Sequence, residues 1–203
     1  MKHRLEFFFD CSSPWTYLAF EYVQRRLAGL EVDIAWRPIL VGGIFNTVNP
    51  SVYQSRETPV ATKAAYMRKD LQDWARMVGL DIKFPPPVFP VNSVKAMRGA
   101  FVALDAGLLV PYARAIFKRY WTDLVDISRD EELAAIVTQV GLDSQQFFAQ
   151  IAGQAIKDRL RDATEECVAR GGFGSPTLFL DGDDMYFGND RIDLMRSRLL
   201  AAG

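Results

Sequence analysis

Patterns typical of β-strands occur only near the two ends of this chain, and helical patterns fill the stretch between them, from about residue 60 to residue 170. Strands from both ends must therefore join one sheet across a helical insertion. Such an insertion is tolerable because the entropic cost of closing a loop grows only with the logarithm of its length. Since 49% of the 203 residues are hydrophobic, the chain can bury a sizeable core and should fold as one unit.

The first strand is predicted over residues 5–10, a short run rich in aromatic residues that is followed by a turn motif. Ser13 suits the N-cap of a helix and Pro14 its first position, and apolar residues then recur at helical spacing until Gly29. Alternating apolar residues predict a second strand over 32–36. A β-α-β unit of this kind places its two strands parallel, with a right-handed crossover.

The middle of the chain is predicted to be helical after a loop over residues 42–59, which are rich in Gly, Asn and Pro. Helical spacing of apolar residues continues to about residue 170, interrupted by a proline-rich segment over 85–90. Ser128 and Glu131 have the spacing of a capping box, which predicts the start of one of these helices.

The last part of the chain predicts a β-hairpin over residues 177–187 and a final helix with Asn189 at its N-cap. The order β-α-β, helical block, β-β-α predicts an α/β protein with a thioredoxin-like fold and a large all-helical insertion between the two halves. The predicted domains are a thioredoxin-like domain formed by residues 1–60 and 171–203 and a helical insertion domain over 61–170.

Composition narrows the classes of function. With 24 Lys and Arg against 25 Asp and Glu, the net charge is −1, so no electrostatic argument supports a nucleic-acid partner. No apolar segment has the length of a membrane span or of a secretory signal, and we expect a cytoplasmic protein without a membrane partner. Cys11 and Cys167 form no C-x-x-C pair and suit reduced thiols. The single histidine, His3, precedes the first strand, which argues against a Ser-His-Asp hydrolase and a histidine-based metal site.

The most informative position is the start of the first helix, where free N–H groups and a partial positive charge favour anions. The segment from Ser13 to Thr16 has the spacing of a redox C-x-x-C motif with hydroxyl groups in place of both sulfurs, which excludes dithiol exchange there. The hydroxyl of Ser13 could instead stabilise the thiolate of a small-molecule thiol. Alternatively, Ser13 only caps the helix.

Two further segments are candidates for ligand binding. The Ser175–Pro176 bond, just before a strand, is a candidate cis peptide that would turn the Ser175 backbone toward a peptide-like ligand. A trans proline in a turn is the alternative. Asp190 could hold a ligand ammonium group or act only at the start of the final helix.

Four spaced segments together resemble the 2-hydroxychromene-2-carboxylate isomerases, which belong with the kappa-class glutathione transferases. The segments are residues 7–19, 63–75, 173–179 and 185–191. The resemblance implies glutathione as cofactor, a homodimer and Ser13 as the catalytic serine. It further implies that Ser175, beside a cis Pro176, pairs with the cysteinyl backbone of glutathione. Four other residues would lie near the ligand, with the first two at its γ-glutamyl end: Asn189, Asp190, Lys63 and Asn49.

The activity implied by the resemblance is a glutathione-dependent isomerisation of 2-hydroxychromene-2-carboxylate, or of a related aromatic-derived keto acid, by reversible thiol addition. A kappa-class-like glutathione transferase and a non-catalytic glutathione-binding protein are the alternatives. The chain departs from the family pattern at Cys11 and Ser12, where apolar residues are expected. Cys11 is therefore either a second thiol near the site or a small buried hydrophobe.

Overall fold

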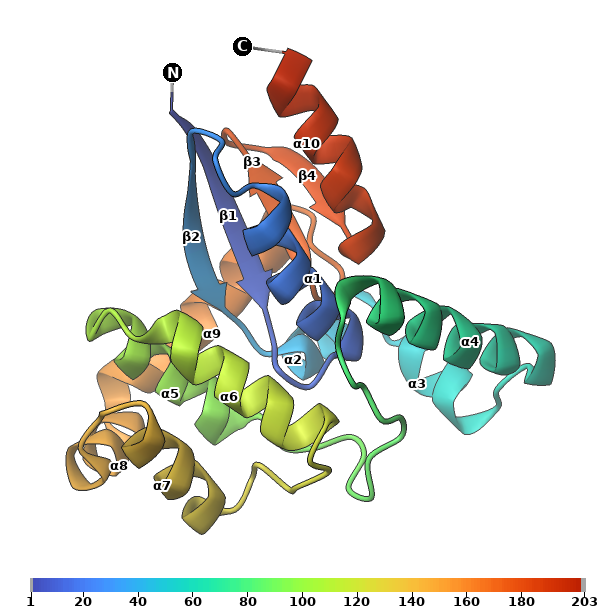
Figure 1. Cartoon of the computed structure of the whole chain (residues 1–203). Helices are drawn as coiled ribbons and strands as arrows, with labels where there is room; N and C mark the ends of the chain where they lie inside the picture. The colour runs from blue at the N-terminus through green and yellow to red at the C-terminus, as the bar shows by residue number, and fades with distance from the viewer. Residues whose placement is uncertain (1, 202–203) are drawn as a thin grey trace.

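A computed structural model describes residues 2–201 and shows a four-stranded sheet surrounded by helices (Figure 1). The elements in chain order are β1 (His3–Phe9), α1 (Pro14–Arg26), β2 (Val32–Pro38), α2 (Val41–Val48), α3 (Ser51–Glu57), α4 (Ala61–Val78), α5 (Val94–Asp105), α6 (Leu109–Trp121), α7 (Asp130–Gln139), α8 (Ser144–Ala152), α9 (Gln154–Ala169), β3 (Thr177–Leu180), β4 (Asp184–Phe187), the 3₁₀ turn η1 (Asn189–Arg191) and α10 (Ile192–Ala201).

The strand order is β2-β1-β3-β4, so the two ends of the chain share one sheet, as predicted. Strand β1 pairs parallel with β2 and antiparallel with β3, and Phe7 lies opposite Trp36 on one side and Leu178 on the other. Strands β3 and β4 form the predicted hairpin. The thioredoxin-like arrangement with a helical insertion is confirmed.

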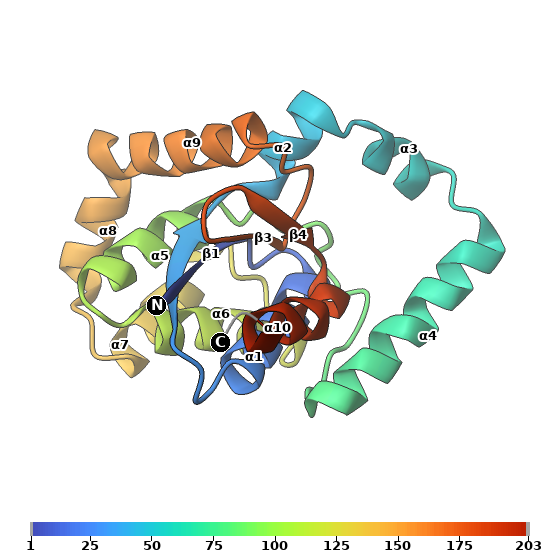
Figure 2. The ribbon, with the colours of Figure 1, turned by 90° about the horizontal axis from the view of Figure 1, so that it is seen from above.

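Helices cover both faces of the sheet. Figure 2 shows α9 on one side of the strands and α1 with α10 on the other, while α5 and α6 lie below the carboxyl end of β1 in Figure 1. Because both faces are covered, Phe7, Phe8 and Phe9 are all buried even though successive side chains of a strand point to opposite faces. This explains why β1 is a continuous aromatic run rather than an alternating one.

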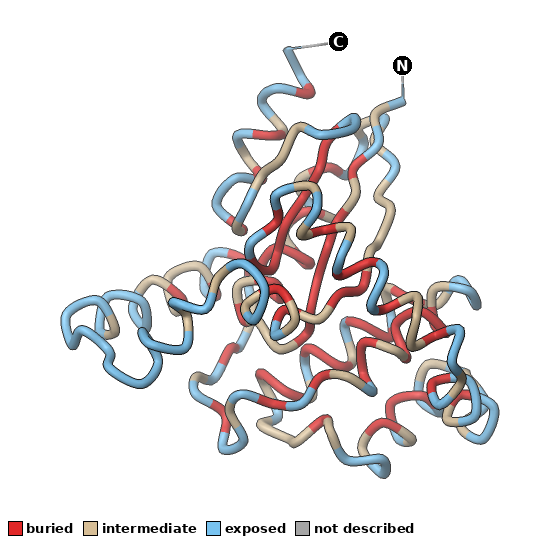
Figure 3. The backbone as a smooth tube through the Cα atoms, turned by 180° about the vertical axis from the view of Figure 1, so that it is seen from behind, coloured by how far each residue is buried: buried red, intermediate tan, exposed pale blue. Residues whose placement is uncertain are grey.

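The helical insertion packs directly on the thioredoxin-like part. Phe117 of α6 stacks on Tyr17 of α1, with ring centroids 5.0 Å apart and planes inclined by 3°. Buried hydrophobic residues of both parts belong to one cluster. Figure 3 shows buried residues, in red, both in the sheet and in the insertion. The insertion thus helps to position the loop that follows β1.

The predicted loop over 42–59 is wrong, because this segment forms the helices α2 and α3. Tertiary contacts stabilise α2 despite its two glycines. The buried carboxylate of Asp10 accepts a hydrogen bond from the N–H of Val41 at 2.9 Å, and Ile44 is fully buried. Local composition carries no signal for either contact.

Two predicted helix starts are also corrected. Arg129, not Ser128, occupies the N-cap of α7, and no side chain caps that helix. The N–H of Ser128 instead donates to Asp126, which closes a local turn. Asn189 does not cap the final helix, because it lies within η1 with Gly188 at the N-cap position.

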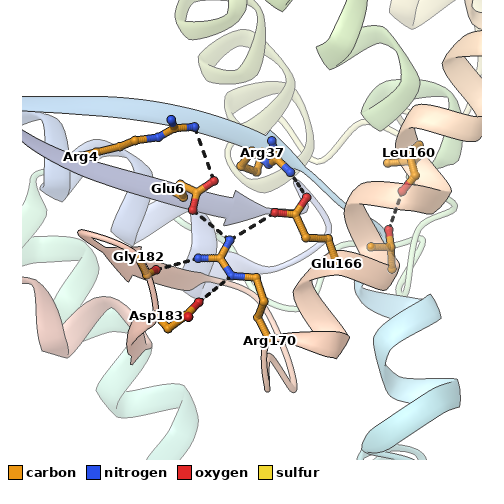
Figure 4. Close-up of polar contacts among 9 residues, drawn as sticks. Arg4, Glu6, Arg37, Leu160, Glu166, Arg170, Gly182 and Asp183 are labelled. Atoms are coloured by element: carbon orange, nitrogen blue, oxygen red, sulfur yellow. Dashed lines mark hydrogen bonds and ion pairs between the residues drawn. The ribbon is translucent and has the colours of Figure 1, made fainter.

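An ion cluster ties the end of α9 to the sheet (Figure 4). The guanidinium of Arg170 lies 2.9 Å from Glu6 of β1 and 3.2 Å from Glu166, and it donates to the carbonyl of Gly182 at 2.7 Å. It also lies 3.9 Å from the ring centroid of Phe179. These contacts hold α9 against the face of the sheet opposite α1.

Helices α3 and α4 extend away from the sheet as an arm (Figures 1 and 2). Helix α3 has no buried residue, and only the second half of α4 is anchored, through Leu71, Ala75 and Val78. Trp74 contacts Tyr22 of α1 edge-on, with ring centroids 6.1 Å apart. Within residues 2–201, no helix combines the length and the apolar character that a membrane span requires.

Candidate functional site

Ser13 occupies the N-cap of α1, with Pro14 at the first helical position, as predicted. Its hydroxyl oxygen accepts a hydrogen bond from the N–H of Thr16 at 3.2 Å. The same hydroxyl donates to the carbonyl oxygen of Ser175 at 3.1 Å. Ser13 therefore caps the helix and also contacts the second predicted site segment, and its role toward a thiolate stays a prediction.

Ser175 links the ends of three elements. The peptide bond between Ser175 and Pro176 is cis, as predicted. The side-chain oxygen of Ser175 accepts from the N–H of Asp10 at 3.0 Å and shares a hydrogen bond of 2.8 Å with the hydroxyl of Thr16. The segment before β3, the end of β1 and the first turn of α1 are thereby held together.

Asp10 is buried and holds the segment between β1 and α1 in place through its hydrogen bonds. Its carboxylate accepts hydrogen bonds from the N–H of Ser12 at 2.9 Å, from the N–H of Val41 at 2.9 Å and from the hydroxyl of Ser93 at 3.1 Å. Burial raises the pKa of Asp10, although these donors oppose the shift. Sequence reasoning treated Asp10 only as the end of a strand.

Cys11 is held by the helical insertion. Its N–H donates to the sulfur of Met97 at 3.4 Å, and its carbonyl accepts from the indole N–H of Trp121 at 2.8 Å. The thiol is buried, and burial together with the nearby Asp10 carboxylate raises its pKa well above the ordinary value. A protonated, buried thiol is a poor nucleophile, which favours the interpretation of Cys11 as a small hydrophobe.

A cleft of about 350 Å³ opens beside Ser175. Four of the predicted binding residues line it, namely Ser175, Pro176, Asn189 and Asp190. The remaining lining residues are Trp15, Asp70, Trp74, Phe187, Gly188 and Arg191. Ser13 does not itself line the cleft, but its hydroxyl donates to the carbonyl of the lining residue Ser175.

Polar and charged side chains of η1 also line the cleft, and one of them has a buried donor without a partner among the described residues. Asn189 is 4% exposed, and its side-chain nitrogen Nδ2 is buried without a hydrogen-bond partner among residues 2–201. Asp190 is exposed and lies 2.7 Å from the guanidinium of Arg191. A buried amide donor beside an acid and a base suits a zwitterionic ligand end.

The structure does not bring Lys63 and Asn49 to the cleft. Lys63 is exposed in the first turn of α4, on the arm, and does not line the cleft. The side-chain nitrogen of Asn49 donates to the carbonyl of Phe173 at 3.1 Å, which supports the segment leading to Ser175. Ligand contacts of these two residues stay predictions.

Sequence reasoning missed the contribution of α4 to the cleft. Asp70 and Trp74 line it, although Trp74 also belongs to the apolar stripe of an amphipathic helix. Nothing in the sequence indicates which residues of that stripe line the cleft instead of packing in the core. Among the described residues, no group of three His, Cys, Asp or Glu side chains could hold a metal ion.

Comparison with known proteins shows the family to which this chain belongs. A model of the DsbA-like thioredoxin domain matches residues 4–200. The 2-hydroxychromene-2-carboxylate isomerase of Pseudomonas putida is 29% identical over 200 residues, which cover 96% of this chain and 93% of the relative. Human glutathione S-transferase kappa 1 is 27% identical over 209 residues, covering 96% of this chain and 90% of the transferase.

A solved structure agrees with these relatives. That of a 2-hydroxychromene-2-carboxylate isomerase superposes with a TM-score of 0.81 at 25% identity, covering 98% of this chain and 95% of the other. The resemblance inferred from the four sequence segments is thus confirmed over nearly the whole chain. The chain belongs to the family of DsbA-like thioredoxin domains, as a relative of 2-hydroxychromene-2-carboxylate isomerases and kappa-class glutathione transferases.

Proposed function

We propose that this protein is a glutathione-dependent isomerase that acts on 2-hydroxychromene-2-carboxylate or a related aromatic-derived keto acid. The observation that carries the proposal is the hydrogen bond from the hydroxyl of Ser13, at the N-terminus of α1, to the carbonyl of Ser175. It joins a thiolate-stabilising group to a backbone that can pair with a peptide. The similarity to the isomerase from Pseudomonas putida supports the isomerisation, and the similarity to the kappa-class glutathione transferase supports glutathione as the thiol.

Binding of glutathione would exchange this internal hydrogen bond for two bonds to the ligand. The hydroxyl of Ser13 would turn from the Ser175 carbonyl to the thiolate, and that carbonyl would accept the N–H of the cysteinyl residue. The N-terminus of α1 favours the anion as well, since its first turn contains no acidic residue. Hydroxyl and helix together would lower the pKa of the bound thiol.

The γ-glutamyl end of glutathione would occupy the far part of the cleft. It carries an ammonium and a carboxylate, which are complementary to Asp190 and to the unpaired amide nitrogen of Asn189. The carboxylate of Asp190 would either leave Arg191 and bind the ammonium group or contact both cations at once. This assignment gives the buried donor of Asn189 an acceptor.

The reaction needs a temporary loss of double-bond character. The hemiketal ring of 2-hydroxychromene-2-carboxylate first opens: the bond between C2 and the ring oxygen breaks as the hydroxyl proton passes to that oxygen, which gives a phenol and a ketone conjugated to the double bond. The thiolate then adds to the carbon β to this ketone, and the displaced electron pair moves onto the carbonyl as an enolate. The former double bond is then a single bond and can rotate. Collapse of the enolate reforms the double bond and expels the same thiolate, so glutathione is regenerated and no oxidant or reductant is consumed. One anion-stabilising site serves both addition and expulsion.

The test is to incubate the protein with glutathione and 2-hydroxychromene-2-carboxylate and to identify the products by NMR. Formation of an isomer with glutathione unchanged supports the proposal. A stable glutathione conjugate would indicate the kappa-class type of transfer. Binding of glutathione without turnover of either kind would indicate a non-catalytic glutathione-binding protein. Omission of glutathione is the control, because an isomerase of this mechanism is inactive without the thiol.

A further inference from the structure

We propose a second binding site in a cavity between α2, α5 and α9, which takes a small organic carboxylate with an apolar body. The cavity measures about 460 Å³ and shares no lining residue with the cleft beside Ser175. Its volume lies within the range typical of small-molecule sites, about 300–1,000 Å³. The proposal does not depend on the reaction at Ser13.

One side of the cavity is a continuous stripe of α9. Leu160, Thr164 and Val168 follow one another at four-residue spacing and therefore lie on the same face of the helix. The hydroxyl of Thr164 donates to the carbonyl of Leu160 at 2.7 Å and accepts from the N–H of Leu40 at 3.0 Å. Because its hydrogen bonds are satisfied within the protein, the wall formed with Leu40 offers mainly apolar surface.

Two cations at the cavity have no carboxylate partner. Arg98 of α5 lines the cavity, and its Nε is buried without a hydrogen-bond partner among the described residues. Lys157 also lines it, and no ion pair within residues 2–201 involves its side chain. The third cation, Arg161, differs because it lies 2.7 Å from both Asp158 and Asp162. The one carboxylate among the lining residues, Glu165, lies 4.0 Å from Arg161, so within residues 2–201 the lining cations without an ion pair are Arg98 and Lys157.

This combination defines the class of ligand. A buried N–H without an acceptor is unfavourable, and an oxygen of an anion would satisfy it. A carboxylate placed between Arg98 and Lys157 would also compensate both charges. The apolar wall of α9 would then cover the body of the ligand. The geometry thus points to a monocarboxylate with an aromatic or aliphatic body rather than to a strongly polar metabolite.

Calorimetric titration with 1-naphthoate tests the site, and 1-naphthamide is the neutral ligand of the same shape. We expect 1-naphthoate to bind and the amide to bind about ten-fold more weakly or not at all. Octanoate in place of naphthoate distinguishes an aliphatic from an aromatic preference. The Arg98→Met variant keeps most of the side-chain stem and should bind naphthoate about ten-fold more weakly. Lys95→Met is the matched control, since it removes one positive charge from the same helix outside the cavity.

Three results would overturn the proposal. These are failure of the wild-type protein to bind either carboxylate, unchanged affinity in Arg98→Met, and loss of affinity in Ser13→Ala, which would place the probe at the other cleft. If Arg98→Met does not fold, Lys157→Gln replaces it, because this half-buried side chain takes part in no hydrogen bond or ion pair within residues 2–201. Glutathione affinity, measured in parallel, reports on the Ser13 cleft alone. The two proposals can therefore fail separately.

Discussion

The hydroxyl of Ser13 and the carbonyl oxygen of Ser175 lie 3.1 Å apart although 162 positions separate the two residues in the sequence. This bond closes the chain across the entire helical insertion, at the point where α1 begins and β3 follows. A ligand that replaces it contacts both halves of the thioredoxin-like part at once. In the proposed function, this bond would couple thiol activation at Ser13 to backbone recognition at Ser175.

Replacing Ser13 by alanine removes the hydroxyl that would stabilise the thiolate. We expect the pKa of bound glutathione to rise by about one to two units, since a hydrogen bond to a charged group contributes about 1.5–3 kcal/mol. Ultraviolet absorption of the thiolate, followed during a pH titration, measures this shift. Ser12→Ala is the matched control, because it removes the neighbouring hydroxyl but leaves the bond between Ser13 and Ser175. An unchanged thiol pKa in Ser13→Ala would remove Ser13 from the mechanism.

Asp190→Asn separates a ligand-binding role from a structural one. The bond between Asp190 and Arg191 is exposed, so the variant should keep nearly the same melting temperature. Its dissociation constant for glutathione should rise about three- to ten-fold, as expected for a half-exposed charge pair. A des-amino analogue of glutathione should bind both proteins alike in calorimetric titration. Equal losses for the two ligands would show that Asp190 does not contact the ammonium group.

Asp10 makes the stability of the fold depend on pH. Burial raises the pKa of this carboxyl above its ordinary value of 3.8, so the folded protein keeps the proton at pH values where the unfolded chain has lost it. The resulting stabilisation is fully present below pH 3.8 and is lost as the pH rises through the folded pKa. In urea unfolding, the free energy of wild type relative to Asp10→Asn should fall as the pH rises above about 4. A difference that does not change with pH would contradict this assignment.

Two glycine substitutions should have opposite effects on stability. A Cβ atom at Gly99 would overlap the ring of Phe147 and the hydroxyl of Tyr112, so Gly99→Ala should cost about 1–3 kcal/mol through overpacking. At Gly42 a Cβ atom meets no atom within 4 Å, and Gly42→Ala should stabilise α2 by about 0.5–1 kcal/mol. Urea unfolding of both variants measures the two changes. Equal stabilities would mean that α5 shifts enough to accommodate the added methyl group.

The sequence alone determined the local elements at the two ends of the chain and their order around the helical insertion. The aromatic run of β1, the Ser13 and Pro14 start of α1 and the hairpin before η1 all follow from residue patterns within a few positions. It also determined that a C-x-x-C chemistry is absent at α1, since both positions carry hydroxyls. Such features are predictable because propensity, capping and turn chemistry depend on near neighbours.

Only the tertiary structure decided which residues meet. Helix α2 forms where composition predicted a loop, because Asp10 binds the N–H of Val41 and the core buries Ile44. Asn189 lies in a buried turn rather than at the cap of the final helix, and it lines the cleft beside Ser175. Lys63, which the family resemblance also placed near the ligand, is exposed on the arm formed by α3 and α4. The physical reason is that burial and hydrogen bonding between segments far apart in the chain depend on how those segments pack. Patterns among neighbouring residues give no information about that packing.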